Sequence, residues 1–118
     1  MYFGELYVGN PEQKMQVIFD TGSDWLVLEA KACSNCLKNS YDAHLSETFE
    51  RVDDDLVEHI YGTAQLYGLD ARDDVSLDKN GRVKVIMFEF FEVLKQYGIT
   101  ENVDGILGMC RPWVDESY

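Results

Sequence analysis

Short apolar runs separated by turn residues extend along most of this chain, and they restrict it to folds built from β-strands. Residues 3–8 alternate between apolar and polar, and Gly9-Asn10-Pro11 separates them from a second run over 13–19. Alternation bounded by Gly, Asn and Pro is typical of half-buried strands joined as a hairpin. The sequence predicts an all-β fold, with strands at 3–8, 13–19, 25–28, 57–61, 64–69, 75–77 and 83–91.

Two further connections have the composition of tight turns. Gly62-Thr63 separates 57–61 from 64–69, and Asn80-Gly81 precedes the long apolar run that begins at Val83. Asn-Gly favours a hairpin because both residues tolerate positive φ. Residues 93–97 suggest a short helical turn, and the polar segment 29–55 is expected to be loop.

Length and charge limit the classes of partner. At 118 residues the chain is one small domain or part of a larger one. Its 22 acidic and 10 basic residues give a net charge of −12, which repels nucleic acid and anionic lipid. We therefore expect no nucleic-acid partner and no membrane partner. No apolar run approaches the length of a membrane-spanning helix.

The chain contains three cysteines, and two of them form one short motif. Cys33 and Cys36 form a C-x-x-C. A zinc ribbon needs a second such pair, and a thioredoxin-like site needs a following helix pattern. We interpret the pair as a disulfide that closes a surface loop, with reduced thiols as the alternative. Cys110 is then either buried or paired outside this chain.

The run Val17–Ser23 ends an apolar strand with Asp20 inside a Thr-Gly turn. A carboxylate partly withdrawn from water has a proton affinity that its neighbours can tune. That property suits acid–base chemistry on a water molecule. An ordinary β-turn between two core strands explains the same residues, since Asp and Gly are both common in turns.

Five segments, taken in order, resemble the N-terminal lobe of the pepsin-like aspartic proteases. They are an opening hairpin, an active-site sequence, a Ser/Thr segment, a flap hairpin and an Asp-Gly sequence, at Tyr2–Gln13, Val17–Ser23, Ser46–Phe49, Ile60–Thr63 and Asp104–Gly108. Their separations also fit that family. The resemblance implies that residues 1–118 form the N-terminal lobe of a bilobal peptidase domain, an incomplete fold without its C-terminal lobe.

The resemblance also implies roles at the active-site turn. Asp20 would be one of two catalytic aspartates. Thr21 would brace the loop of the partner lobe, Gly22 would allow close approach of substrate, and Ser23 would hydrogen-bond Asp20. No metal or other cofactor is implied.

Substrate contacts follow from the same resemblance. Tyr61, Gly62 and Thr63 would form a flap over an extended polypeptide substrate. Ile18 and Ile106 would line the pocket for the side chain that precedes the scissile bond. The alternative is that Tyr61 is an ordinary strand aromatic and that the two isoleucines are ordinary core residues.

The chain departs from the family pattern at three points. Ala64 replaces the second glycine of the flap, and Val27 replaces the tryptophan that supports the flap tyrosine. Trp25 stands two residues before Val27. The third departure is that only one Asp-Thr-Gly is present.

A single catalytic aspartate leaves three accounts of function open. In the first account the chain is the front part of a bilobal aspartic endopeptidase and is inactive until the missing lobe is supplied. In the second account it forms a homodimer in which a second copy supplies the other aspartate. In the third it is an inactive, peptide-binding fragment. The family implies the secretory pathway, a lysosome or vacuole, or the extracellular space.

An incomplete lobe has a physical consequence. Strand edges and apolar side chains that would meet the partner lobe would be exposed to water. We therefore expect self-association of the isolated chain, despite its charge.

Overall fold

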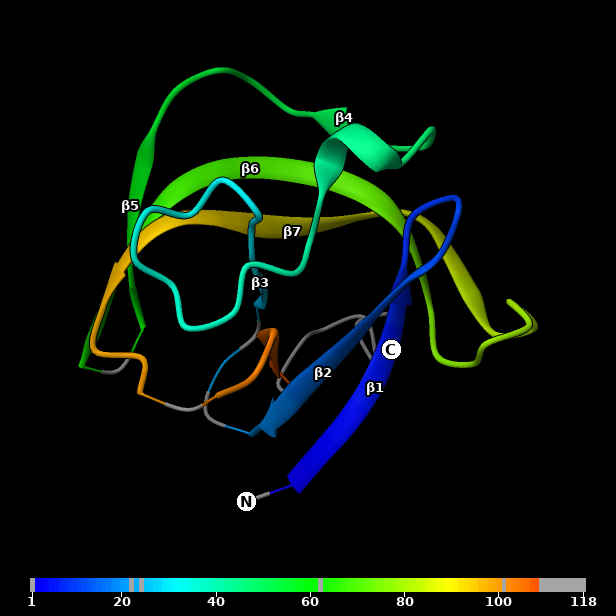
Figure 1. The fold of residues 1–118 in the computed structure, drawn as a ribbon, viewed down its shortest axis with the longest axis horizontal. Helices are drawn as coiled ribbons and strands as arrows, with labels where there is room; N and C mark the ends of the chain where they lie inside the picture. Colours follow the sequence, from blue (N-terminus) through cyan, green and yellow to red (C-terminus); the bar gives the residue numbers. More distant parts are fainter. Residues whose placement is uncertain (1, 22, 24, 62, 101, 109–118) are drawn as a thin grey trace, which may run out of the picture.

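The computed structural model describes residues 2–21, 23, 25–61, 63–100 and 102–108. Within them, strands account for nearly all regular structure, and one 3₁₀ turn, η1 (Ala43–Leu45), lies between β3 and β4 (Figure 1). The strands are β1 (Tyr2–Val8), β2 (Gln13–Asp20), β3 (Leu26–Glu29), β4 (Glu50–Arg51), β5 (Val57–Tyr61), β6 (Ala64–Ser76), β7 (Lys84–Tyr97) and β8 (Gly105–Gly108). The predicted all-β class is confirmed.

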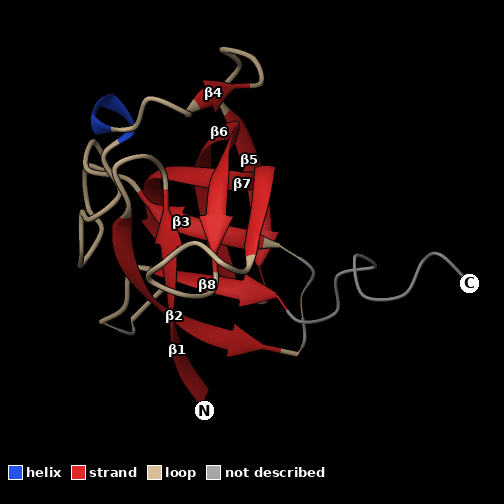
Figure 2. Cartoon of the chain, turned by 90° about the vertical axis from the view of Figure 1, so that its right-hand side faces the viewer, coloured by secondary structure: helices blue, strands red, loops and turns tan. Residues whose placement is uncertain are grey.

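The strands form one strongly curved sheet with the order β1-β2-β8-β3-β7-β6-β4. β1 also pairs with β6 through Tyr7↔Ser76 and Val8↔Val75, so the sheet curls back on itself as a small barrel (Figure 2). β5 lies against β6 outside this path. In the described residues no helix has the length and apolar character needed to cross a membrane.

β8 separates two strands that are consecutive in the sequence. β2 runs parallel to β8, with Asp20 opposite Gly108, and β3 runs antiparallel to the other edge of β8. The end of the Asp104–Gly108 segment is therefore placed beside the Asp-Thr-Gly turn, while its start lies beside Gln16 and Val17. The order of the sheet brings together two motifs that lie far apart in the chain.

Apolar side chains pack on both faces of the central strands. Successive residues of a strand point to opposite faces. Phe90 accordingly belongs to a cluster inside the barrel, and Phe91 belongs to a second cluster under the β5–β6 hairpin. Every residue of β3 and β8 is buried. These two central strands are thus held by apolar packing on each side.

The sequence prediction was wrong about two segments. Residues 64–69 and 75–77 are not separate strands, because β6 continues through the charged segment between them. Residues 93–97 are not a helical turn: they are the end of β7, where Gln96 pairs with Leu66 and Tyr97 pairs with Gln65. The predicted hairpin around Asn80-Gly81 is confirmed by the pairing of Ser76 with Lys84.

The long connection after β3 is loop for most of its length, as expected. It contains the disulfide between Cys33 and Cys36, which confirms the preferred interpretation of the C-x-x-C pair. The Asn39 amide donates to the carbonyl oxygens of Ala30, Lys31 and Cys33 at 3.2, 3.3 and 2.7 Å. These bonds give the loop a defined shape without regular structure.

Candidate active site

Asp20 is the last residue of β2 and the first partly exposed carboxylate after a buried apolar run. Val17 and Ile18 are buried on β2, whereas Asp20 is half-buried and Thr21 is exposed. Ser23 is half-buried, and Gly22 lies outside the described residues. The pairing with β8 therefore holds the backbone of Asp20 in place at the end of β2, opposite Gly108.

Gly108 is in close contact with the turn that follows Asp20. Its backbone N–H donates to the Trp25 carbonyl oxygen at 2.6 Å. A Cβ atom on Gly108 would lie 2.5 Å from Ser23 Oγ and 2.5 Å from the Trp25 nitrogen. Since neither distance leaves room for a methyl group, only glycine allows the end of β8 to lie against this turn.

Asp104 holds the strands beneath the candidate site together. Its Oδ2 accepts from the Gln16 backbone N–H at 2.6 Å, and its Oδ1 accepts from the Ser40 hydroxyl. Its carbonyl oxygen accepts from the Glu29 N–H at 2.8 Å. One side chain and its backbone thus join β2, β3 and the following loop. The sequence analysis found Asp104 by its motif and missed Gln16 and Ser40, which no local pattern indicates.

The candidate flap is a two-stranded hairpin built on the barrel. β5 pairs with β6, and the Tyr61 backbone is opposite Ala64 at the end of the hairpin. Thr63 is exposed and Ala64 is buried. The side chain of Tyr61, and Gly62 as a whole, lie outside what the structure describes.

The turn after Asp20 and the candidate flap hairpin meet through Trp25. The Trp25 ring lies 4.2 Å, between centroids, from the imidazole of His59 on β5. Val27, which takes the family tryptophan's place, is buried in the cluster under the hairpin, and Trp25 packs against that cluster. The sequence analysis did not single out His59, because its partners come from three distant segments.

Ile18 and Ile106 are direct neighbours on β2 and β8. Their exposed fractions are 8% and 6%, and Ile106 belongs to the cluster under the hairpin. In this chain both isoleucines therefore pack as core residues close to Asp20. Their assignment to a substrate pocket stays a prediction.

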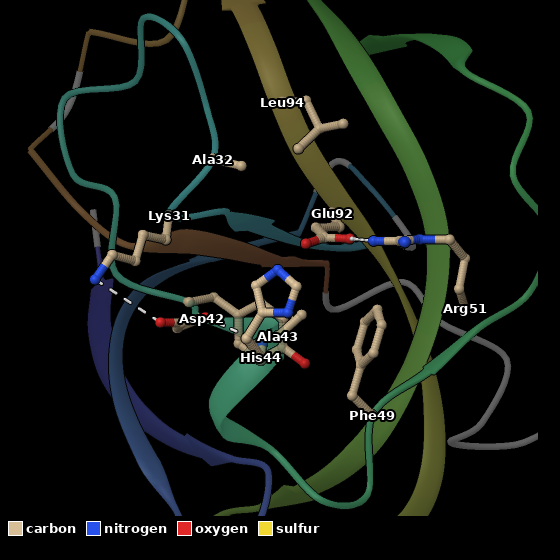
Figure 3. A pocket seen from close by; sticks show the side chains of 10 residues that line it. Lys31, Ala32, Asp42, Ala43, His44, Phe49, Arg51, Glu92 and Leu94 are labelled. Carbon is tan, nitrogen blue, oxygen red and sulfur yellow. Dashed lines mark hydrogen bonds and ion pairs between the residues drawn. The ribbon is translucent and has the colours of Figure 1, made fainter.

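A cavity lies on another part of the molecule (Figure 3). It has a volume of about 490 Å³ and lies between the 31–51 segment and β7. Lys31 pairs with Asp42 at 3.8 Å, and Arg51 pairs with Glu92 at 3.2 Å. None of the predicted site residues lines this cavity, and its ion pairs neutralise the charges that could hold a ligand. We therefore retain the Asp20 turn as the candidate site.

Comparison with known proteins assigns the family. The family model for eukaryotic aspartyl proteases matches residues 1–117. The chain belongs to the eukaryotic aspartyl protease family. Asp20, at the end of β2 and opposite Gly108, is at the position that the resemblance gives to a catalytic aspartate of that family. The described strands are consistent with the N-terminal lobe of the pepsin fold.

Several curated aspartyl proteases are similar to nearly all of this chain. Cathepsin D of Gallus gallus is 39% identical over 94% of the chain, and chymosin of Camelus dromedarius is 35% identical over 99%. Vacuolar protease A of Aspergillus fumigatus is 32% identical over 92%. The matched regions cover 29%, 31% and 28% of those proteins. The chain thus spans less than a third of the length of these relatives.

Proposed function

We propose that this chain supplies one of the two carboxylates of an aspartic endopeptidase, and that Asp20 is that carboxylate. The observation that carries the proposal is the position of Asp20 at the end of buried β2, opposite Gly108, in a chain of the aspartyl protease family. A buried strand and a close glycine contact hold the residue in place. Catalytic groups need this kind of fixed geometry.

The reaction requires two carboxylates in different protonation states. One is ionised and takes a proton from a water molecule, which attacks the peptide carbonyl directly. The other is protonated and donates a hydrogen bond to the oxygen on which negative charge develops. Two carboxylates that lie close together cannot both ionise, so a pair provides both states. The sequence contains one Asp-Thr-Gly, and Asp20 alone cannot fill both roles.

The neighbouring residues have supporting roles in this proposal. Thr21, Gly22 and Ser23 shape the turn that presents Asp20 to the second aspartate. Support comes from the contact between Gly108 and this turn, which fixes the path of the backbone around Ser23.

The substrate is an extended polypeptide in this proposal. Tyr61, Gly62 and Thr63 close over it, and Ile18 and Ile106 form part of the pocket for the residue before the scissile bond. Support comes from the hairpin that β5 forms with β6 and from the position of both isoleucines beside Asp20 on neighbouring strands.

We propose that the second aspartate comes from a C-terminal lobe, within a domain of which residues 1–118 are the N-terminal lobe. The support is that the matched relatives are more than three times as long as the region they share with this chain. The alternative is a homodimer in which two copies of Asp20 face each other across a two-fold axis. A secretory, vacuolar or lysosomal location fits the disulfide and the name of vacuolar protease A.

A chimeric enzyme tests the proposal. This chain replaces the matched segment of chicken cathepsin D, and cleavage of a denatured protein is measured at acid pH. We expect cleavage that a pepstatin-type inhibitor blocks and that Asp20→Asn reduces at least roughly a hundredfold. The control is Asp54→Asn, since Asp54 is an exposed loop residue. A folded chimera without activity, or an Asp20→Asn chimera that cleaves as fast as the parent, would overturn the proposal.

A further inference from the structure

A cluster of an imidazole, a carboxylate and two aromatic rings joins the turn after Asp20 to the candidate flap. His59 on β5 lies with its ring centroid 4.2 Å from Trp25 and 4.4 Å from Phe91 on β7. Its Nε2 faces Oδ1 of Asp70 on β6 at 3.8 Å. The turn after Asp20 and three strands therefore meet at one imidazole.

The two polar atoms of this cluster are buried without a hydrogen bond. His59 Nε2 and Asp70 Oδ1 are both inaccessible to solvent, and neither has a hydrogen-bond partner within the described residues. A distance of 3.8 Å is within the range of an ion pair and longer than a hydrogen bond. Buried polar atoms in this state are costly, and a small movement would let each satisfy the other.

We propose that His59 is a positioning residue of the protease: in its protonated form it pairs with Asp70 and holds the β5–β6 hairpin against Trp25 of the active-site turn. The inference rests on the proposed function, because it gives the hairpin the role of a flap. Tyr61 lies two residues after His59 on β5. Any shift of β5 at His59 is thus transmitted directly to the end of the hairpin.

Protonation favours the paired arrangement for two reasons. An imidazolium donates a shorter and stronger hydrogen bond to a carboxylate than a neutral imidazole does. A cation is also attracted to the face of an indole ring. Both effects act in the mildly acidic range in which a carboxylate is ionised and an imidazole is protonated.

Asp70 on β6 supplies the carboxylate that His59 faces, whereas the turn after Asp20 and β7 contribute the uncharged rings of Trp25 and Phe91. On β5 itself, Glu58 accepts a hydrogen bond from the Tyr67 hydroxyl at 3.1 Å. Among the described residues, the ion-pair partner of His59 is therefore Asp70.

A short path connects this cluster to Asp20. The Trp25 carbonyl oxygen accepts from Gly108 at 2.6 Å, and Gly108 is opposite Asp20 in the β2–β8 pair. Trp25 thus contacts His59 through its ring and β8 through its backbone. A small displacement of His59 can therefore be passed through Trp25 to Gly108, which lies opposite Asp20.

The fluorescence of Trp25 in the 118-residue chain tests the inference. Trp113→Phe leaves Trp25 as the one remaining tryptophan. Because a protonated imidazole quenches an indole that it contacts, we expect the emission to fall as the pH drops through the mildly acidic range. His59→Gln should abolish this transition, and Asp70→Asn should move its midpoint to lower pH. His44→Gln, which changes the other and exposed histidine, should leave it unchanged.

Amide hydrogen exchange of the hairpin provides the second measurement. We expect the amides of β5 and the start of β6 to exchange more slowly below the transition than above it, after correction for intrinsic rates, in the parent and in His44→Gln. His59→Gln should lose the difference. If His59→Gln does not fold, the NMR titration of the His59 ring in the parent and in Asp70→Asn gives the same comparison.

Two results would overturn the inference. The first is a Trp25 transition that persists in folded His59→Gln. The second is a His59 titration that Asp70→Asn leaves unmoved. Neither measurement needs peptide cleavage, so failure of the inference and failure of the proposed function are separate outcomes.

Discussion

Glu29 is a buried carboxyl group that makes stability depend on pH. It is 1% exposed, its Oε1 accepts from the Lys38 N–H at 3.0 Å, and its Oε2 has no hydrogen-bond partner among the described residues. Burial, with a smaller contribution from the Asp104 carboxylate, raises the pKa of Glu29 from 4.5 to about 7. The folded state therefore holds this proton more tightly than the unfolded state, so its contribution to stability is full in acid and is lost as pH rises toward 7.

Glu29→Gln should remove this dependence, because glutamine imitates the protonated acid. We expect the free energy of unfolding of the variant, relative to that of the parent, to rise by about 3 kcal/mol between pH 4 and pH 7.5. Urea unfolding at several pH values measures it. Glu47→Gln is the control, since Glu47 is exposed. A constant difference between Glu29→Gln and the parent across this range would contradict the assignment.

The residues of the candidate site differ in how far the sequence predicts them. Asp20 could be singled out because its signal is local: an apolar run ends in a turn that contains a carboxylate. The contacts of Asp104 and His59 could not be predicted in full, because Gln16, Ser40 and Asp70 reach them only after the sheet has formed. A local pattern indicates the candidate residue, and topology determines its surroundings.

At the scale of elements, most strands could be predicted from the sequence, but the full extent of β6 and β7 could not. Residues 70–74 contain three aspartates and an arginine, which favour a break between strands. The strand continues because Asp73 is fully buried and bonded, with Tyr41 Oη donating at 2.7 Å and Thr48 Oγ1 donating at 2.5 Å. Both hydrogen-bond partners of Asp73 come from the long loop after β3, so no local sequence pattern predicts them. Tertiary hydrogen bonds overrode the propensity of the segment.

The prediction of a helical turn at the end of β7 was wrong for a related reason. Residues 93–97 have no strand pattern of their own, yet they pair with the start of β6. Asn35 adds support from the loop: its Oδ1 accepts from the Gln96 N–H at 2.9 Å, and its amide donates to the Gln96 carbonyl oxygen at 2.8 Å. A pairing between segments about thirty residues apart cannot be read from either one alone.

The shape of the loop after β3 depends on the side-chain amide of Asn39. Asn39→Asp would replace a donor to three carbonyl oxygens with a carboxylate that can only accept. We expect a loss of about 1–2 kcal/mol in the free energy of unfolding at pH 6.5, measured with urea. Asn80→Asp is the matched control, because Asp-Gly suits the hairpin turn as well as Asn-Gly does. Equal losses at the two positions would contradict this role for Asn39.

The whole molecule is a closed curved sheet with apolar side chains exposed at one end. Leu77, Val83, Val85 and Ile86, at and near the β6–β7 turn, are between 43% and 63% exposed. Clusters of exposed apolar side chains are typical of surfaces that another protein segment covers. Ser76, just before this turn, pairs with Tyr7, whereas Phe19, next to Asp20, pairs with Tyr2 at the opposite end of β1, so this surface lies away from the candidate site.

The central claim is that this chain holds one half of a two-carboxylate site. Acid-pH cleavage of a denatured protein by the 118-residue chain alone tests it most directly, with the molar mass measured in the same solution. Asp20→Asn is run beside it, and the cathepsin D chimera serves as the positive control. The account predicts no cleavage by the monomer and Asp20-dependent cleavage by the chimera. Asp20-dependent cleavage by a chain shown to be monomeric would contradict it.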